Sequence, residues 1–152
     1  MSNCFVLFIQ MRAYTFISLL FMAYPLTTYG QEFSELTWKN RIIVMVADDA
    51  SDKIFQDQTS EFSACLGDLS ERKLLIYQVL PDSFRVVQPY LTPWKKSDSW
   101  YRKFGNYQGD HEILLVGLDG GIKLRKNEAI SCSEISNLID QMPMRRAEMK
   151  SK

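Results

Sequence analysis

The apolar run Arg41–Ala47 (RIIVMVA) constrains the fold of this chain more than any other feature of the sequence. A strand-length run that is apolar throughout and rich in β-branched residues is typical of a central strand, covered on both faces, in a parallel or mixed sheet. Apolar residues then recur at helical spacing over residues 54–70, after Ser51 or Asp52, either of which can cap a helix. A second apolar run, Lys73–Leu80, follows. This order predicts a right-handed βαβ crossover.

The middle of the chain is less regular and ends in a predicted hairpin. Asp82–Lys96 has no clear period, so we expect an irregular loop there. Ser97–Phe104 is expected to form a short helix. Asp119-Gly120-Gly121 predicts a tight turn, because glycine accepts the positive φ that such turns require. The turn would join strands at Glu112–Leu118 and Ile122–Lys126.

The end of the chain predicts one more helix. Ser131 suits its N-cap and Glu134 the capping-box position, and Met142-Pro143 would end it before a basic tail. A βαβ unit followed by a hairpin and a closing helix is the core of thioredoxin-like proteins. We therefore expect an α/β fold of thioredoxin-like type, with a central mixed sheet of four strands.

The first thirty residues have the pattern of a secretory signal peptide. Arg12 is their single charge, Ala13–Leu26 is apolar, and small residues in Thr28-Tyr29-Gly30 suit cleavage after Gly30. Translation from Met11 would place the charge directly before the apolar run. An uncleaved anchor is the alternative, but the run is shorter than the roughly 20 residues of a membrane span. We expect residues 1–30 to be removed, leaving a single domain over 31–152, periplasmic or secreted, with no stable membrane span.

The overall charge of the chain excludes one class of partner. Eighteen Lys and Arg residues balance 18 Asp and Glu residues, which gives a formal net charge of zero. Binding to nucleic acid through bulk charge requires a basic excess, so no nucleic-acid partner is predicted.

Four strings of the chain resemble one known family. They are WKNRIIVMVA from Trp38, LSERKLLIY from Leu69, ILLVGLDGGIKLR from Ile113 and LIDQMPMRR from Leu138. They are similar to the domain-of-unknown-function 4174 family over nearly all of the expected mature chain. The resemblance implies a thioredoxin-like, peroxiredoxin-related fold and kinship with domains of animal sushi-repeat extracellular proteins. It implies no established activity.

Eight positions of these strings are taken as the family signature. We expect Trp38 to cover the core and Asn40 to lie in the turn that opens the first strand. The signature positions are Trp38, Asn40, Arg41, Asp119, Gly120, Gly121, Met142 and Pro143.

The residues that thioredoxin-type catalysis needs are missing from two places. A reactive thiolate belongs at the end of the first strand, where the following helix lowers its pKa. Here Asp48–Asp52 contains acids and no cysteine. Such enzymes also have a cis-proline before the third strand, and Gly109–Glu112 contains no proline. The sequence therefore favours a protein that is not an enzyme.

The two cysteines after the leader are expected to be unpaired. Cys65 lies about 13 residues into the first predicted helix, roughly 20 Å from its start. Cys132 begins the last helix, and both helices should start at the same end of the sheet. A disulfide needs Cα atoms within about 7 Å, so none is predicted. Cys65 is expected to be a small buried helix residue. Cys132 is either an ordinary first-turn residue or a thiol of lowered pKa, and is the redox candidate.

His111, the single histidine, is expected near Asp48, Asp49 and Asp110. These groups could bind a divalent metal, but their spacing matches no metal motif, and solvation at the surface is the favoured interpretation. No metal and no cofactor is predicted.

Two further groups of residues could form binding surfaces. Arginine forks suit carboxylates and phosphates, so one basic set could bind an anion. On residue type alone, the favoured interpretation is that Arg145 and Arg146 interact with the carbonyls at the end of the last helix or with acids such as Glu148. That set is Lys123, Arg125, Arg145 and Arg146. One aromatic set could either bind a partner or pack the long loop onto the sheet. That set is Tyr90, Trp94, Trp100 and Tyr101.

The sequence as a whole favours an exported, non-catalytic binding or interaction module. Its expected partner is an unknown protein or a small anionic ligand. The alternative is a thiol-redox or peroxidase-type enzyme that uses Cys132 as a relocated cysteine.

Overall fold

Strand β1 (Arg41–Ala47) is an inner strand of a six-stranded sheet, and all seven of its residues are buried. This computed structural model describes residues 31–88, 90–105 and 111–151, so the predicted leader lies outside the described residues. The strand order is β4-β3-β2-β1-β5-β6, which makes the sheet larger than the four strands expected. The expected burial of this run on both faces is confirmed.

The predicted βαβ order with parallel strands is confirmed, although two helices replace the single one expected. After β1 the chain forms helices α3 (Lys53–Ala64) and α4 (Leu66–Glu71) and returns as β2 (Leu74–Leu80), which pairs with β1 in parallel. Of the two caps considered for the first helix, Asp52 is the one used: its carboxylate accepts a hydrogen bond of 2.7 Å from the backbone N–H of Phe55.

On the other side of β1 lies the predicted hairpin. Strand β5 (His111–Val116) pairs antiparallel with β1, and β6 (Ile122–Lys126) pairs antiparallel with β5. Helix α6 (Cys132–Asp140) follows, with Ser131 as the predicted cap. Because β1 and β5 run in opposite directions, the start of β1 lies beside the end of β5.

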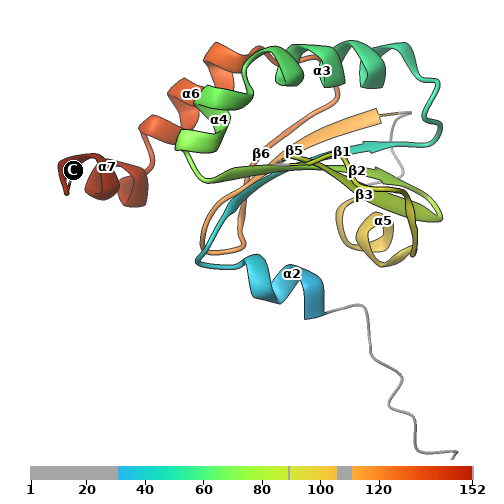
Figure 1. The fold of residues 1–152 in the computed structure, drawn as a ribbon, viewed down its shortest axis with the longest axis horizontal. Helices are drawn as coiled ribbons and strands as arrows, with labels where there is room; N and C mark the ends of the chain where they lie inside the picture. The colour runs from blue at the N-terminus through green and yellow to red at the C-terminus, as the bar shows by residue number, and fades with distance from the viewer. Residues whose placement is uncertain (1–30, 89, 106–110, 152) are drawn as a thin grey trace, which may run out of the picture.

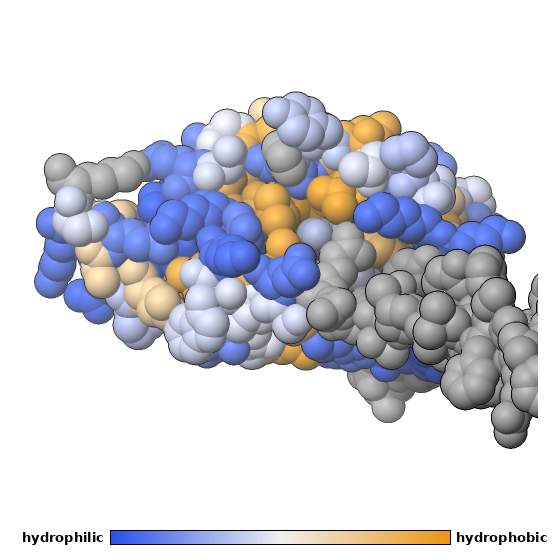
Figure 2. Space-filling view, turned by 60° about the horizontal axis from the view of Figure 1, so that its bottom comes forward, coloured by the Kyte–Doolittle hydropathy of each residue, from blue (hydrophilic) through white to orange (hydrophobic). Residues whose placement is uncertain are grey.

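Helices cover the sheet on both faces, which makes three layers (Figure 1). Helices α3, α4 and α6 pack on one face, where Ile43 and Leu115 belong to the core. Helices α2 (Gln31–Leu36) and α5 (Ser99–Phe104) pack on the opposite face, where Val44 and Trp100 belong to the core. Viewed from this second side, apolar side chains gather in the middle of the face and hydrophilic ones surround them (Figure 2). No helix among the described residues is long and apolar enough to cross a membrane.

The stretch expected to be an irregular loop contains two further strands. Strand β3 (Ser83–Gln88) pairs antiparallel with β2, and β4 (Lys95–Lys96) pairs with β3. The expectation was wrong because Phe84, opposite Val79, is completely buried and stacks near Tyr77 in the core. The tail expected after the last helix also differs, since Pro143–Lys150 forms helix α7 with proline in its first turn.

The expectation that the cysteines are unpaired was wrong, because Cys65 and Cys132 form a disulfide with their Cα atoms 6.4 Å apart. Two features bring them together. Helix α3 stops at Ala64, so Cys65 is its C-cap instead of an interior residue. The chain before α6 first runs along α3, where the Gln58 amide side chain bonds to both the N–H and the C=O of Ile130. Helix α6 therefore begins beside the end of α3.

Candidate functional site

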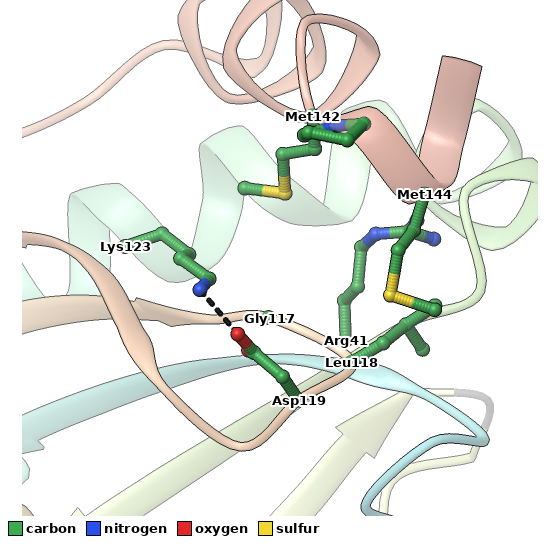
Figure 3. Close-up of a pocket in the computed structure, with 8 residues that line it drawn as sticks. Arg41, Gly117, Leu118, Asp119, Lys123, Met142 and Met144 are labelled. Carbon is green, nitrogen blue, oxygen red and sulfur yellow. Dashed lines mark hydrogen bonds and ion pairs between the residues drawn. The ribbon is translucent and has the colours of Figure 1, made fainter. Parts of the chain in front are cut away.

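A pocket of about 270 Å³ lies at the end of the sheet where β1 begins (Figure 3). Three segments that are distant in sequence form it: the first residue of β1, the β5–β6 hairpin, and the junction of α6 and α7. Apolar side chains and a few charged groups share its wall. The lining residues are Arg41, Gly117, Leu118, Asp119, Lys123, Met142, Pro143 and Met144.

Arg41 is the most unusual residue of the pocket, because its charged side chain is only 1 % exposed. One terminal nitrogen donates to the backbone carbonyl of Arg72 at 2.9 Å, and both terminal nitrogens reach the carboxylate of Glu148. Its Nε is also buried, but has no hydrogen-bond partner among the described residues. An unpaired buried donor is costly and rare in folded proteins, so this nitrogen marks a place where an acceptor fits.

The Glu148 carboxylate holds Arg41 in place from the side of α7. Burial alone would raise the pKa of Glu148, but Arg41, Lys73 and Arg145 keep the pKa below its ordinary value. Arg145 is itself buried and also contacts Asp140 at 3.2 Å. The hydrogen bond from Arg72 is the largest cause that lowers the pKa of Asp140.

This network has more positive than negative charge. Among the described residues, its ion pairs join four cationic side chains and three carboxylates, an excess of one positive charge, and Arg41 is the member that lines the pocket. Its members are Arg41, Arg72, Lys73, Arg145, Glu71, Asp140 and Glu148.

The β5–β6 hairpin forms the opposite wall of the pocket. Lys123 Nζ lies 2.6 Å from Asp119 Oδ2, and this hydrogen bond is the largest cause of the lowered pKa of Asp119. Gly117 lies close under this pair, because a Cβ atom at that position would lie 2.6 Å from Lys123 Cε, so a larger residue there would displace the lysine side chain. Gly120 supplies the positive φ of the turn, at 76°.

Helix α7 begins at the edge of the pocket. Its N-cap residue, Met142, makes no capping hydrogen bond through its side chain, and Pro143 has no N–H. The N–H of Arg146 bonds to the carbonyl of Met142, as the first helical hydrogen bond. The N–H groups of Met144 and Arg145 thus have no acceptor within the described part of the chain.

Most of the family-signature positions lie at or beside this pocket. Arg41, Asp119, Met142 and Pro143 line it, and Gly120 and Gly121 complete the hairpin. Asn40 lies directly before β1, in the opening turn as expected, and its amide approaches the carbonyl of Lys73 at 3.5 Å.

Trp38 was wrongly expected to cover the core. Its side chain is 64 % exposed, and its backbone turns at a positive φ of 68° before β1. Its N–H still donates to the carbonyl of Leu118, at 2.6 Å, which ties this turn to the hairpin wall of the pocket.

The structure does not gather the four predicted anion-binding residues. Lys123 lines the pocket, whereas Arg125 points to Glu112 and to the carbonyl of Phe104. Arg145 is buried in the Glu148 network, and Arg146 is exposed on α7.

The predicted aromatic surface is also divided. Trp100 belongs to the core and stacks on Tyr77 at 4.3 Å between ring centroids. Tyr101 bonds to Asp48, Trp94 lies under the guanidinium of Arg85, and Tyr90 is exposed.

The acids and the histidine considered for a metal lie at the other end of β1. His111 Nε2 contacts the carbonyl of Asn127, and Nδ1 lies 4.0 Å from Asp52. Asp49 accepts from the N–H of Ser51, which lowers the pKa of Asp49, and Asp110 lies outside the described residues. No group of three metal-ligating side chains occurs in the parts of the chain that the structure describes.

Sequence reasoning missed Gly117, Leu118 and Met144 as pocket residues. They are one glycine and two ordinary apolar residues whose role depends on how distant segments meet. Their position inside the family strings was the one available signal.

Comparison with known proteins identifies the family. No curated protein matches the chain. Residues 32–148, however, match the family described as Domain of unknown function (DUF4174). The resemblance predicted from the four strings is therefore confirmed, and the chain belongs to the DUF4174 family.

Proposed function

We propose that this protein is an exported, non-catalytic binding module with a thioredoxin-like fold, and that its ligand binds in the Arg41 pocket. The observation that carries this proposal is that Arg41 lines a pocket and has a buried Nε with no hydrogen-bond partner among the described residues. Concave pockets with apolar walls and a few convergent polar groups are the usual form of small-ligand sites.

The topology of the inner strands supports the thioredoxin-like part of the proposal. Strands β2, β1, β5 and β6 are neighbours in that order, and β5 runs opposite to the other three. A crossover through α3 and α4 connects β1 and β2, and a hairpin connects β5 and β6. Strands β3 and β4 extend this arrangement at one edge.

The position of the cysteines supports a role without catalysis. A thioredoxin-type thiolate would lie at the start of α3, where this chain has Asp52. Cys65 lies at the other end of this 12-residue helix, about 18 Å away, and is bonded to Cys132. For the alternative, a thiol-redox or peroxidase-type enzyme that uses Cys132, this disulfide would have to open and close during turnover.

The disulfide also supports export. Disulfides persist in oxidising compartments such as the periplasm and the extracellular space. A chain with the predicted signal peptide would reach such a compartment, where Cys65 and Cys132 can pair.

Two assays test the proposed function. Insulin reduction with dithiothreitol and consumption of hydrogen peroxide should both run at the buffer rate with this protein, and equally with Cys132→Ser. A rate above background that Cys132→Ser abolishes would overturn the non-catalytic proposal. The mass of the protein recovered from the periplasm or medium should correspond to a chain that starts at Gln31. Recovery of unprocessed chain from the cytoplasm alone would overturn the export.

A further inference from the structure

We infer that the Arg41 pocket binds a carboxylate carried on a short apolar chain. This inference rests on the proposed function, because it names the chemical class of ligand for the same site. Three features select this class: the unpaired N–H donors, the apolar part of the wall, and the position of one carboxylate at the wall.

The donors come from two elements that meet at the pocket. Arg41 Nε is buried and unpaired, and helix α7 begins at the same edge with the N–H groups of Met144 and Arg145 not bonded to any described residue. A helix N-terminus is a favourable place for an anion because N–H groups and the helix dipole point toward it. Several N–H donors without acceptors match a ligand that only accepts hydrogen bonds, which is the property of an ionised carboxylate.

The charge of the surroundings favours one negative charge. The network behind Arg41 has one positive charge in excess. Asp119 also lies at the wall, where it pairs with Lys123 and would repel a second negative charge on the ligand. A monocarboxylate therefore suits the pocket better than a phosphate or a dicarboxylate.

The rest of the wall suits a small apolar body. Leu118, Met142 and Pro143 provide apolar surface, and the volume of about 270 Å³ is just below the roughly 300–1,000 Å³ of drug-sized pockets. Met144 lies beside the Arg41 side chain in Figure 3 and is 43 % exposed. Because methionine is flexible and adapts to irregular space, Met144 can move aside and open a path to Arg41 Nε.

The test is a titration of the ¹⁵N-labelled full chain followed by the Nε–H resonance of Arg41. Hexanoate is the probe. Hexanamide has the same apolar chain without the charge, and inorganic phosphate has negative charge without the apolar chain, so the two serve as controls. We expect a saturable shift of the Arg41 resonance with hexanoate, and none with either control at the same concentration. Equal responses to hexanoate and hexanamide, or no response to hexanoate, would overturn the carboxylate proposal.

A pair of lysine variants tests the location. Lys123→Met removes a charge from the pocket wall and should weaken hexanoate binding about two- to fivefold, in the range of exposed ion pairs. Lys126→Met is the control, since Lys126 has similar exposure and a similar pair with Glu134 but does not line the pocket. Equal effects of the two variants would overturn the assignment to this pocket.

The carboxylate could belong to a free acid or to the end of a polypeptide. The tripeptide Ala-Ala-Leu with a free C-terminus and its amidated form distinguish these sources. Tighter binding of the free peptide than of hexanoate supports a polypeptide C-terminus, and the reverse supports a free acid.

If no carboxylate binds while both redox assays stay at background, the ligand class fails and the proposed function stands. Redox turnover that depends on Cys132 would instead overturn the proposed function itself.

Discussion

The two ends of β1 lie on one buried strand but differ in chemistry. At the start, Arg41 is almost completely buried, has an unpaired Nε and faces a pocket of about 270 Å³. At the end, Asp52 caps α3 by a hydrogen bond to Phe55, and the neighbouring cavity beside His111 measures only about 10 Å³. Asp52 thus serves helix capping, and the larger open space lies at the opposite end, whereas each end holds one buried nitrogen with no hydrogen-bond partner among the described residues: Arg41 Nε at the start and His111 Nδ1 at the end.

The Cys65–Cys132 disulfide is connected to the pocket at the Arg41 end of β1. It joins the end of α3 to the start of α6, and α6 leads directly to Met142 at the pocket. It therefore fixes one wall of the pocket relative to the sheet.

The largest expected effect comes from removing this disulfide. In Cys65→Ser/Cys132→Ser, the free energy of unfolding should fall by about 4 kcal/mol, because the disulfide closes a loop with a sequence separation of 67. Urea denaturation measures the loss. Hydrogen exchange should speed up in α6 and α7 more than in the Asp52 end of α3, and uniform acceleration would contradict the link between the disulfide and the pocket.

The next effect is that of Arg41→Met, which keeps the apolar stem and removes the buried charge. Glu148 and the carbonyl of Arg72 lose a partner, so the free energy of unfolding should fall by about 3 kcal/mol. Urea denaturation measures this loss. The control variant is Arg125→Met, which removes an arginine that is partly exposed. A loss of less than about 1 kcal/mol for Arg41→Met would contradict a central role for this residue.

Acid should affect the Arg41 side through Asp140 and Glu148. The pKa of each is lower in the folded chain than its ordinary value, 3.8 for Asp140 and 4.5 for Glu148. The unfolded chain therefore binds more protons at acid pH, and their contribution to stability is complete above these values and is lost as the pH falls through the folded pKa values. Urea denaturation from pH 6 to pH 3 should show this fall, with a shallower slope in Asp140→Asn. An equal slope would contradict the contribution of Asp140.

The smallest expected effect is at the opposite end of β1. Asp52→Ala removes the cap of α3 and should lower the free energy of unfolding by about 1 kcal/mol. The Arg41 Nε–H resonance should keep its position, because no hydrogen bond among the described residues joins the two ends. A clear shift of that resonance in Asp52→Ala would show that the two ends are not independent.

Part of this fold could be predicted because its signals are local. The run Arg41–Ala47 is apolar on both faces, and the cap at Asp52 and the glycines of the hairpin act over a few residues. Strand β3 escaped prediction because its sequence, SFRVVQ, mixes polar and apolar residues beside prolines. Its pairing depends on Phe84 entering a core formed by other segments.

The disulfide and the pocket could not be predicted because both depend on distant segments. The end of α3 at Ala64 and the contact of Gln58 with Ile130 decide that Cys65 meets Cys132. The signature strings contained the pocket residues, but nothing in their spacing showed that Arg41 and Pro143 share one wall.

The most direct measurement of the central claim is a map of backbone amide shifts in the full chain as hexanoate is added. We expect the shifted amides to cluster at the Arg41 end of β1, around Leu118, Lys123 and Met144. Shifts that cluster instead around Asp52 and His111, or that appear nowhere, would contradict the placement of the binding site in the Arg41 pocket.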